Sequence, residues 1–265
     1  MTVIAFLGAG VMGESILSAM IRGGQDPAQV RVRERSPERA EQLRATHGVV
    51  IAEAVEAVRG ADVVVVAVKP QDVAALLAEV GPAISPEAVV VSIAAGVRTS
   101  TFEQALPPGT AVVRVMPNTP ALVGEGMFAA SPGTGCDEAR LRAVCDLLSS
   151  GGRVVTVDET HQDAVTAVSG SGPAYVFYLV EQMIAGGLEA GLAPEIARTL
   201  ATQTLVGAAA LLEGTGDEPA VLRRRVTSPN GTTAAAIETF EAEGVGAGIR
   251  AGMRAATRRS AELSG

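Results

Sequence analysis

The stretch Phe6–Met20, FLGAGVMGESILSAM, places Gly8, Gly10 and Gly13 between an apolar run and a helical pattern. In a strand–turn–helix unit the first glycine makes the turn and the second lets the backbone approach a pyrophosphate. The third lets the helix pack closely on the strand. A plain turn between strand and helix is the structural alternative. We expect a dinucleotide-binding loop made of Gly8, Ala9, Gly10, Val11, Met12 and Gly13, with phosphate at the helix start.

Short valine-rich runs follow this loop and alternate with helical patterns. They are TVIAFL (2–7), VRVR (30–33), GVVI (48–51), DVVVVAV (62–68), AVVVSIA (88–94), AVVRVM (111–116), GEGMFAAS (124–131) and GGRVVTVD (151–158). Buried parallel strands have this composition, and their alternation with helices is typical of a doubly wound sheet. The sequence therefore predicts a Rossmann-type α/β domain over residues 1–158.

The pattern changes after Asp158, where no further strand is indicated. Helices are expected over 159–172, 173–191, 193–214, 232–244 and 246–264. The fold class is thus an α/β Rossmann-type domain followed by an all-α domain over residues 159–265. Alanine and glycine on these helices allow close packing, within the chain or between subunits.

Composition excludes several classes of function. The net charge of −8 gives no general attraction to nucleic acid or anionic membrane. The only two cysteines, Cys136 and Cys145, have neither disulfide-framework nor metal-site spacing, and two histidines do not suggest a metal centre. No signal peptide and no membrane-spanning run is indicated. We expect a cytoplasmic protein with no metal, nucleic-acid or membrane partner.

The residues after the second strand bear on which dinucleotide binds. Glu34 stands near the position where an acidic residue holds the ribose hydroxyl of NAD. Arg35 and Ser36 can instead grip the 2′-phosphate of NADP by charge-assisted hydrogen bonds. NADPH is favoured, and NADH remains the alternative because of Glu34.

Later strands end at the same edge of the predicted sheet. Lys69, the only lysine of the chain, follows one of them, so it is expected near the cofactor. SIAAGV (92–97) and MPNTPALVGEG (116–126) end two others, and with Asn118 they can form the floor of a nicotinamide site or serve only as structural loops.

The helical half constrains the reaction because it contains no lysine. Reduction of a carbonyl needs a proton donor for the developing alkoxide. This argues against a 3-hydroxyacid dehydrogenase, whose family uses a lysine in the helical domain. A protonated imine is already electrophilic, so its reduction mainly requires a cofactor, a substrate anchor and correct orientation.

VTSPNGTTAAAI (226–237) supplies a suitable anchor. Gly231, Thr232 and Thr233 lie at a turn entering a helix, where free N–H groups suit a carboxylate. The hydroxyls of Ser228 and Thr233 can add hydrogen bonds. The alternative is that Thr232 or Ser228 simply caps the helix.

The sequence resembles the pyrroline-5-carboxylate reductases over nearly its whole length. The matching segments are FLGAGVMGESI, AVKPQ, SIAAGV, RVMPNTPALVGEG, AVTAVSGSGPAYVFYLVE, GLEAGL and VTSPNGTTAAAI. The resemblance implies an NADPH-dependent reduction of 1-pyrroline-5-carboxylate to L-proline. It implies a homodimer through the helical domain, with larger rings in several members, such as a decamer of five dimers.

The resemblance also implies roles for individual residues. Ser36 and the glycine loop would contact the cofactor, together with Ala67, Val68, Lys69, Pro70, Ala95 and Gly96. Backbone N–H groups of Gly231, Thr232 and Thr233 would hold the substrate carboxylate, and Thr233 and Ser228 would be the catalytic residues. Residues 169–173 would help close the pocket. Asn230 replaces a glycine common in the family, but asparagine tolerates a left-handed backbone, so we expect the turn to form.

Two other functions stay open at this point. A reductase of another cyclic imine would need a wider pocket and would lack the carboxylate anchor. A regulatory protein would bind the dinucleotide without turnover.

Overall fold

The computed structural model describes residues 2–264 of the chain. It divides into two compact units. The first holds the residues before Gly172 and those from Ala256 onward, and the second is Gly172–Ala255. The domain boundary expected after Asp158 follows the last strand and stays a prediction.

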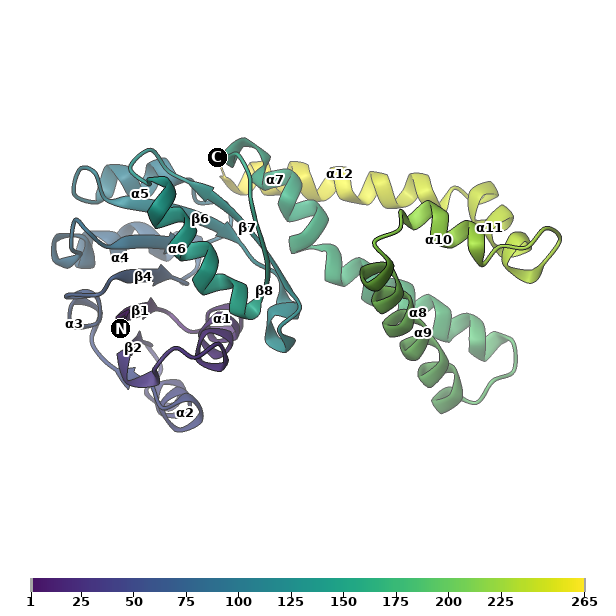
Figure 1. The fold of residues 1–265 in the computed structure, drawn as a ribbon, viewed down its shortest axis with the longest axis horizontal. Coiled ribbons are helices and arrows are strands. Elements are labelled where there is room, and N and C mark those ends of the chain that lie inside the picture. The colour runs from purple at the N-terminus through teal and green to yellow at the C-terminus, as the bar shows by residue number, and fades with distance from the viewer. Residues whose placement is uncertain (1, 265) are drawn as a thin grey trace. The chain divides into compact units, whose positions relative to one another are not determined.

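The first unit is built on one eight-stranded sheet of order β3-β2-β1-β4-β5-β6-β7-β8 (Figure 1). Its strands are β1 Ile4–Leu7, β2 Val30–Arg33, β3 Val50–Ile51, β4 Val63–Val66, β5 Val89–Ser92, β6 Ala111–Met116, β7 Gly126–Pro132 and β8 Gly152–Thr156. Every strand expected from the sequence is present, so the prediction of a doubly wound sheet is confirmed. The β6–β7 pair is antiparallel and all other pairs are parallel.

The strand register sets the position of the site. Leu7 pairs with both Arg33 of β2 and Val66 of β4, and Val66 pairs with Ser92 of β5. The loops after these four strands therefore leave from one edge of the sheet. The strand order reverses between β1 and β4, and ligands of open parallel sheets bind outside such a switch point.

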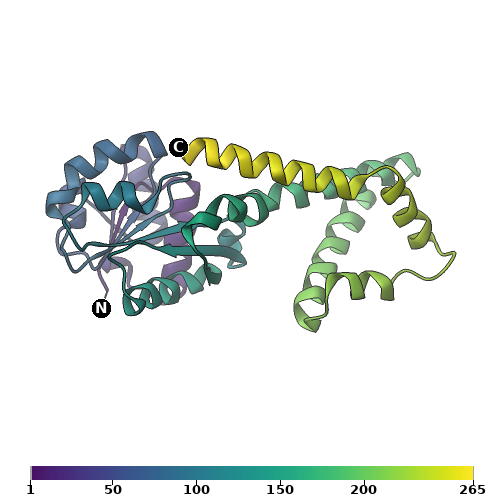
Figure 2. The same ribbon diagram turned by 90° about the horizontal axis from the view of Figure 1, so that it is seen from above.

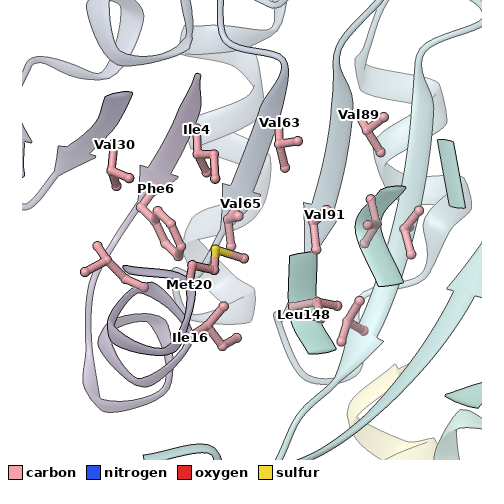
Figure 3. Close-up of a cluster of buried hydrophobic side chains, with 14 of the residues drawn as sticks. Ile4, Phe6, Ile16, Met20, Val30, Val63, Val65, Val89, Val91 and Leu148 are labelled. Carbon is pink, nitrogen blue, oxygen red and sulfur yellow. The ribbon is translucent and has the colours of Figure 1, made fainter. Parts of the chain in front are cut away.

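Helices lie on both faces of the sheet (Figure 2), and each face carries a hydrophobic cluster, of which Figure 3 shows one. Alternate residues point to opposite faces, so Ile4 and Phe6 join one cluster while Ala5 and Leu7 join the other. Figure 3 shows Ile16 and Met20 of a helix packed near Phe6 and Val65. Each fully buried side chain of this size contributes about 1.5–3 kcal/mol, which fixes the strand ends that carry the site.

The helices around the sheet complete this layer. They are α1 Val11–Arg22, α2 Pro37–His47, α3 Ala54–Val58, α4 Val73–Val80, α5 Thr99–Ala105 and α6 Glu138–Leu148. Short helical turns are η1 Pro27–Gln29, η2 Pro70–Asp72, η3 Gly81–Ala83, η4 Thr119–Val123, η5 Ser149–Gly151 and η6 Glu159–His161.

The remainder of the described chain is helical, as expected. Its elements are α7 Gln162–Val165, η7 Thr166–Gly170, α8 Gly172–Glu189, α9 Pro194–Thr215, α10 Pro219–Arg225, α11 Thr232–Ala242 and α12 Val245–Ser264. Two local expectations were wrong. Residues 159–172 do not form one α-helix, because η7 is a π-type turn. Helix α10, which starts with Pro219 and ends with three arginines, was not predicted from the sequence.

Other features limit the chemistry of the described residues. Among residues 2–264, no helix combines the length and apolarity needed to cross a bilayer. Within the same range, no group of three or more acidic, histidine or cysteine side chains is placed to hold a metal. Cys136 and Cys145 are free thiols, and burial raises the pKa of both. Because a thiolate is the reactive form, these cysteines are poor nucleophiles.

Candidate functional site

The glycine loop lies between the ends of β1, β2 and β4. Gly8 has φ +91°, and its N–H donates to the Arg33 carbonyl at 2.9 Å. A Cβ at Gly8 would lie 3.0 Å from the carbonyl oxygen of Ala67, the residue after β4. Gly8 therefore needs to be glycine for its conformation and for this approach. The expected cofactor residues Gly8 and Ala67 are brought together.

The space around Gly10 is open, whereas the space around Gly8 is filled by Ala67. Gly10 is the N-cap of α1 with no side-chain cap, it is exposed, and a Cβ there would meet nothing within 4 Å. The first bond of the helix runs from the Glu14 N–H to the Gly10 carbonyl at 2.9 Å, so earlier N–H groups have no helical acceptor. An uncapped helix start behind an open glycine fits the pyrophosphate of a dinucleotide.

The residues that bear on cofactor choice join the same loop. The Glu34 carboxylate accepts the N–H groups of Arg35 at 2.7 Å and Ser36 at 3.2 Å, and also that of Ala9 at 3.3 Å. Arg35 pairs with Asp72 at 2.9 Å, and the Ser36 hydroxyl caps α2. The structure thus places Glu34, Arg35 and Ser36 beside the glycine loop, with Glu34 holding the backbone donors of the other two.

A cluster of charged and polar side chains that contacts the glycine loop was not predicted from the sequence. Glu14 of α1 accepts from Arg39 and lies 3.0 Å from His47 Nε2, and Arg39 also donates to the Ala9 carbonyl at 3.5 Å. Burial raises the pKa of the Glu14 carboxyl, but the hydrogen bonds from His47 and Arg39 outweigh this, so the net pKa is lowered. The partners come from different elements, so no local motif reveals this cluster.

The other expected cofactor residues follow β4 and β5. Lys69 and Pro70 are exposed at the start of η2. After β5, Ala95 is exposed, whereas Gly96 has φ +76° and is buried. All of these residues lie at the edge to which the four parallel strands lead.

Asn118 links three segments at the end of β6. Its side chain is buried, its Nδ2 donates to the Ser169 carbonyl at 3.1 Å, and its Oδ1 accepts from the Met127 N–H at 2.8 Å. A Cβ at Gly170 would lie 2.4 Å from Met116 Cε. The π-type turn η7 is therefore held against β6, and such turns occur frequently at functional sites.

Asn118→Ala is expected to destabilise the first unit by about 1–3 kcal/mol, because it leaves the partly buried Met127 N–H and Ser169 carbonyl without these partners. Urea unfolding followed with hydrogen exchange at the Met127 amide measures this. A change below about 0.5 kcal/mol with Met127 still protected would contradict the assigned link.

The turn before α11 carries the expected substrate residues in the second unit. Asn230 has φ +60°, and the Gly231 N–H donates to the Ser228 carbonyl at 3.0 Å. The expectation that Asn230 sustains this turn is confirmed. Gly231 is the N-cap, and no side chain caps the helix. The alternative expectation, that Thr232 or Ser228 simply caps α11, is therefore wrong.

The Thr233 hydroxyl has no hydrogen bond within the described residues. Along other helices the threonine hydroxyl donates to the carbonyl four residues earlier, as Thr239 does to Ala235 at 2.9 Å. Four residues before Thr233 lies Pro229, outside the helix, so this bond is not formed. The N–H groups before Ala235, which donates to Gly231 at 3.2 Å, likewise lack helical acceptors. The start of α11 thus offers unused donors beside a free hydroxyl.

The doubly wound sheet and the glycine loop at its switch point define a dinucleotide-binding protein with an added helical part. Residues 159–263 match the model for pyrroline-5-carboxylate reductase dimerisation, and residues 3–96 match that for F420-dependent NADP oxidoreductases. A pyrroline-5-carboxylate reductase of Corynebacterium melassecola is 42% identical over 99% of both chains. This chain belongs to the pyrroline-5-carboxylate reductase family.

Other relatives agree over the full length. A pyrroline-5-carboxylate reductase of Pseudomonas aeruginosa is 43% identical, over 98% of this chain and 96% of that one. The solved reductase of Coxiella burnetii has a TM-score of 0.93 and 32% identity, covering 100% of this chain and 99% of that chain. The Plasmodium falciparum enzyme, solved with NADP bound, has a TM-score of 0.88 and 26% identity over 99% and 98%.

Proposed function

We propose that this protein reduces 1-pyrroline-5-carboxylate to L-proline with NAD(P)H, the last step of proline biosynthesis. The observation that carries the proposal is the start of α11, where uncapped N–H groups adjoin the free Thr233 hydroxyl. Such N–H groups suit the substrate carboxylate, and the hydroxyl suits the ring nitrogen. The dinucleotide-binding loop and the family relationship support the same reaction.

The residues of this chain need to perform little acid–base chemistry in this reaction. A protonated ring imine accepts a hydride and becomes a neutral amine, so no strong acid on the protein is required. The bound dinucleotide supplies the hydride. Thr232 and Thr233 hold the carboxylate through their N–H groups, and Gly231, whose own N–H donates to the Ser228 carbonyl, sets the turn that presents them. The Thr233 hydroxyl, supported by Ser228, orients the imine nitrogen. Rate is gained mainly from holding the reacting groups in line.

The dinucleotide would be held along the edge of the sheet. The N–H groups of Val11, Met12 and Gly13 at the start of α1 take its pyrophosphate, since those of Gly8 and Ala9 already donate to Arg33 and Glu34, and Arg35 and Ser36 lie toward the ribose end. Ala67, Val68, Lys69 and Pro70 flank the loop, and Ala95 and Gly96 follow β5 toward the nicotinamide.

We propose NADPH as the preferred cofactor. Arg35 and Ser36 lie beside the glycine loop, and the Plasmodium falciparum relative was solved with NADP. Glu34 opposes this preference, since its carboxylate accepts the N–H groups that a 2′-phosphate would use. A bound 2′-phosphate must therefore displace this carboxylate.

Ser36→Ala or Arg35→Ala is expected to raise the KM for NADPH roughly 10-fold, because each removes a hydrogen bond to a charged group, and to change that for NADH much less. Glu34→Gln is expected to shift the preference further toward NADPH. Arg44→Ala, which removes an exposed pair with Glu41 on the same helix, is the matched control. An unchanged NADPH to NADH ratio in the Ser36 and Arg35 variants removes them from the 2′-phosphate site.

We propose that the second unit forms a homodimer. Of residues 172–255, only Ala197 and Ala201 are buried, while Phe177, Leu200 and Leu211 are at least half exposed. A helical unit needs another apolar surface to cover such faces. The match to a dimerisation model supports a second copy of this chain as the partner. A decamer of five dimers remains a prediction.

Light scattering at several protein concentrations measures the mass of the assembly. A stable mass of two chains or a multiple of two supports the homodimer, and a single-chain mass at all concentrations overturns it.

An absorbance assay of nicotinamide oxidation tests the reaction. Purified protein is mixed with racemic 1-pyrroline-5-carboxylate and either NADPH or NADH, and proline is quantified. Turnover with equal amounts of proline formed and cofactor oxidised supports the proposal. Cofactor binding without turnover overturns it, in favour of another imine substrate or a binding protein without activity.

A further inference from the structure

The end of α12 lies against the loop that follows β5. A Cβ built on Gly96 would come within 2.7 Å of the Leu263 carbonyl oxygen and 3.3 Å of the Ser264 nitrogen. Gly96 is therefore covered by the backbone of α12, whereas its neighbour Ala95 is exposed. These residues belong to the first unit, and Figure 2 shows this end of α12 in yellow. A helix from the end of the sequence thus contacts the loop expected to face the nicotinamide.

A partly buried hydrogen bond holds this end of α12 in place. Ser260 is 7% exposed, and its hydroxyl donates to Asp163 Oδ1 of α7 at 2.7 Å. Ser264 donates to the Ser260 carbonyl at 2.9 Å and approaches the same Asp163 oxygen at 3.4 Å. A hydrogen bond to a carboxylate is stronger than one between neutral groups. Asp163 therefore fixes the turn of α12 that contains Leu263.

The other end of the loop, at Thr99, is fixed by η6, the helical turn that directly precedes α7. The N–H and hydroxyl of Thr99 donate to the Glu159 carboxylate at 2.8 and 2.7 Å. The guanidinium of Arg114, which is almost fully buried, lies 3.3 Å from Glu159. Residues 159–163 thus hold the loop directly at Thr99 and, through α12, at Gly96.

Between these two points the loop buries Ala94 in the second hydrophobic cluster and packs Val97 against it, but Ala95 itself is exposed. Gly96 has φ +76°, and glycine restricts the backbone less than any other residue. The bond from the Val97 N–H to the Ala94 carbonyl is 3.3 Å long. The contact of the Leu263 backbone with Gly96 is thus an added restraint directly beside Ala95.

We propose that Asp163 and Ser260 are positioning residues for cofactor binding. They hold the Leu263 backbone against Gly96 and so keep Ala95 in place to face the nicotinamide half of the dinucleotide. The inference rests on the proposed function only for the identity of the ligand. The role of Gly96 is then mainly to leave room for the backbone of α12, because a side chain at this position would collide with the Leu263 carbonyl.

The test compares Asp163→Ala with two matched variants of the full chain. Asp163→Asn keeps an oxygen that accepts the Ser260 hydroxyl in a weaker, neutral bond, so it should retain most of the parent behaviour. Arg259→Ala removes an exposed pair with Glu262 on the same helix and leaves the Ser260 to Asp163 bond intact, so it should have no effect. Ser260→Ala removes the donor of the same hydrogen bond. It replaces Asp163→Ala in the comparison if that variant does not fold.

Two readouts separate positioning from general stability. Hydrogen exchange of the peptide covering 93–99, measured without ligand, should become roughly 10-fold faster in Asp163→Ala and Ser260→Ala. The Kd for NADPH should rise roughly 10-fold, while that for 2′-phospho-ADP-ribose, which lacks nicotinamide, should not change.

Unchanged exchange in the 93–99 peptide would overturn the proposal, as would equal losses of affinity for the two ligands. The exchange measurement needs neither cofactor nor substrate. Absence of imine turnover would therefore count against the proposed function alone and leave this inference standing on its own readout.

Discussion

Thr233→Ala is expected to lower kcat roughly 100-fold while leaving the Kd for NADPH nearly unchanged. The loss has the size seen when one preorganised hydrogen bond to the reacting centre is removed. Thr233 is at the second position of α11, and its hydroxyl is unused in the described structure. In the proposed reaction this hydroxyl orients the ring nitrogen, so it acts on the chemical step and not on the dinucleotide.

Two variants of the same helix sharpen this test. Thr233→Ser retains the hydroxyl and should keep most of kcat. Thr239→Ala removes a hydroxyl that only bonds the Ala235 carbonyl on an exposed face, so it should behave as the parent. Steady-state kinetics with a separate cofactor titration measures both quantities. Equal losses of kcat and NADPH affinity in Thr233→Ala would remove this residue from its catalytic role.

The sheet could be predicted from the sequence because its signal is local. Runs such as Val63–Val66 are apolar on both faces, and glycines and helical patterns separate them. The orientation of β7 could not be predicted, because it depends on pairing with β6 and not on the composition of Gly126–Pro132. Helix α10 was missed because seven residues show too little periodicity, although Pro219 was an available start signal.

The candidate site was predictable only where a motif carries it. The glycine loop and the turn at Asn230 follow from short-range chemistry. The contacts of Glu34 with Ala9, of Glu14 with His47 and of Leu263 with Gly96 join residues far apart in sequence. Nothing near these residues in the sequence indicates the partner, so only the fold reveals them.

The position of the Thr233 hydroxyl could be predicted from the sequence, but its availability for bonding could not. The sequence places it near a helix start, but whether it caps the helix, bonds a carbonyl or stays free depends on where the helix begins. That boundary is Thr232, with Gly231 as the N-cap. A shift of one turn would have given Thr233 an internal acceptor, so its availability is a structural finding.

Gly10→Ala is expected to leave the thermal midpoint unchanged or slightly raised while weakening NADPH binding by about 10- to 100-fold. A Cβ at this position meets nothing within 4 Å, and φ is −65°, so alanine fits the free protein. Replacing glycine in a compatible conformation reduces the entropy of the unfolded chain. The same Cβ would occupy the space through which the backbone N–H groups approach a pyrophosphate, and those bonds are charge-assisted.

Gly8 and Gly13 provide the contrast within the same loop. Gly8 has φ +91°, where alanine is strained, and a Cβ at Gly13 would lie 3.0 Å from Ala67 Cβ and 3.1 Å from the Gly8 carbonyl oxygen. Gly8→Ala and Gly13→Ala should therefore lower the thermal midpoint as well as cofactor affinity. Thermal unfolding and NADPH fluorescence titration of the three variants give the comparison.

The value of Gly10→Ala is that it separates binding from folding. If the variant is as stable as the parent and binds NADPH poorly, the open space at Gly10 is where the pyrophosphate lies. If it binds NADPH as the parent does, no phosphate approaches this backbone, and the assignment of the loop to the dinucleotide is wrong. Because the free structure has room for the added methyl group, neither result can be attributed to a disturbed fold.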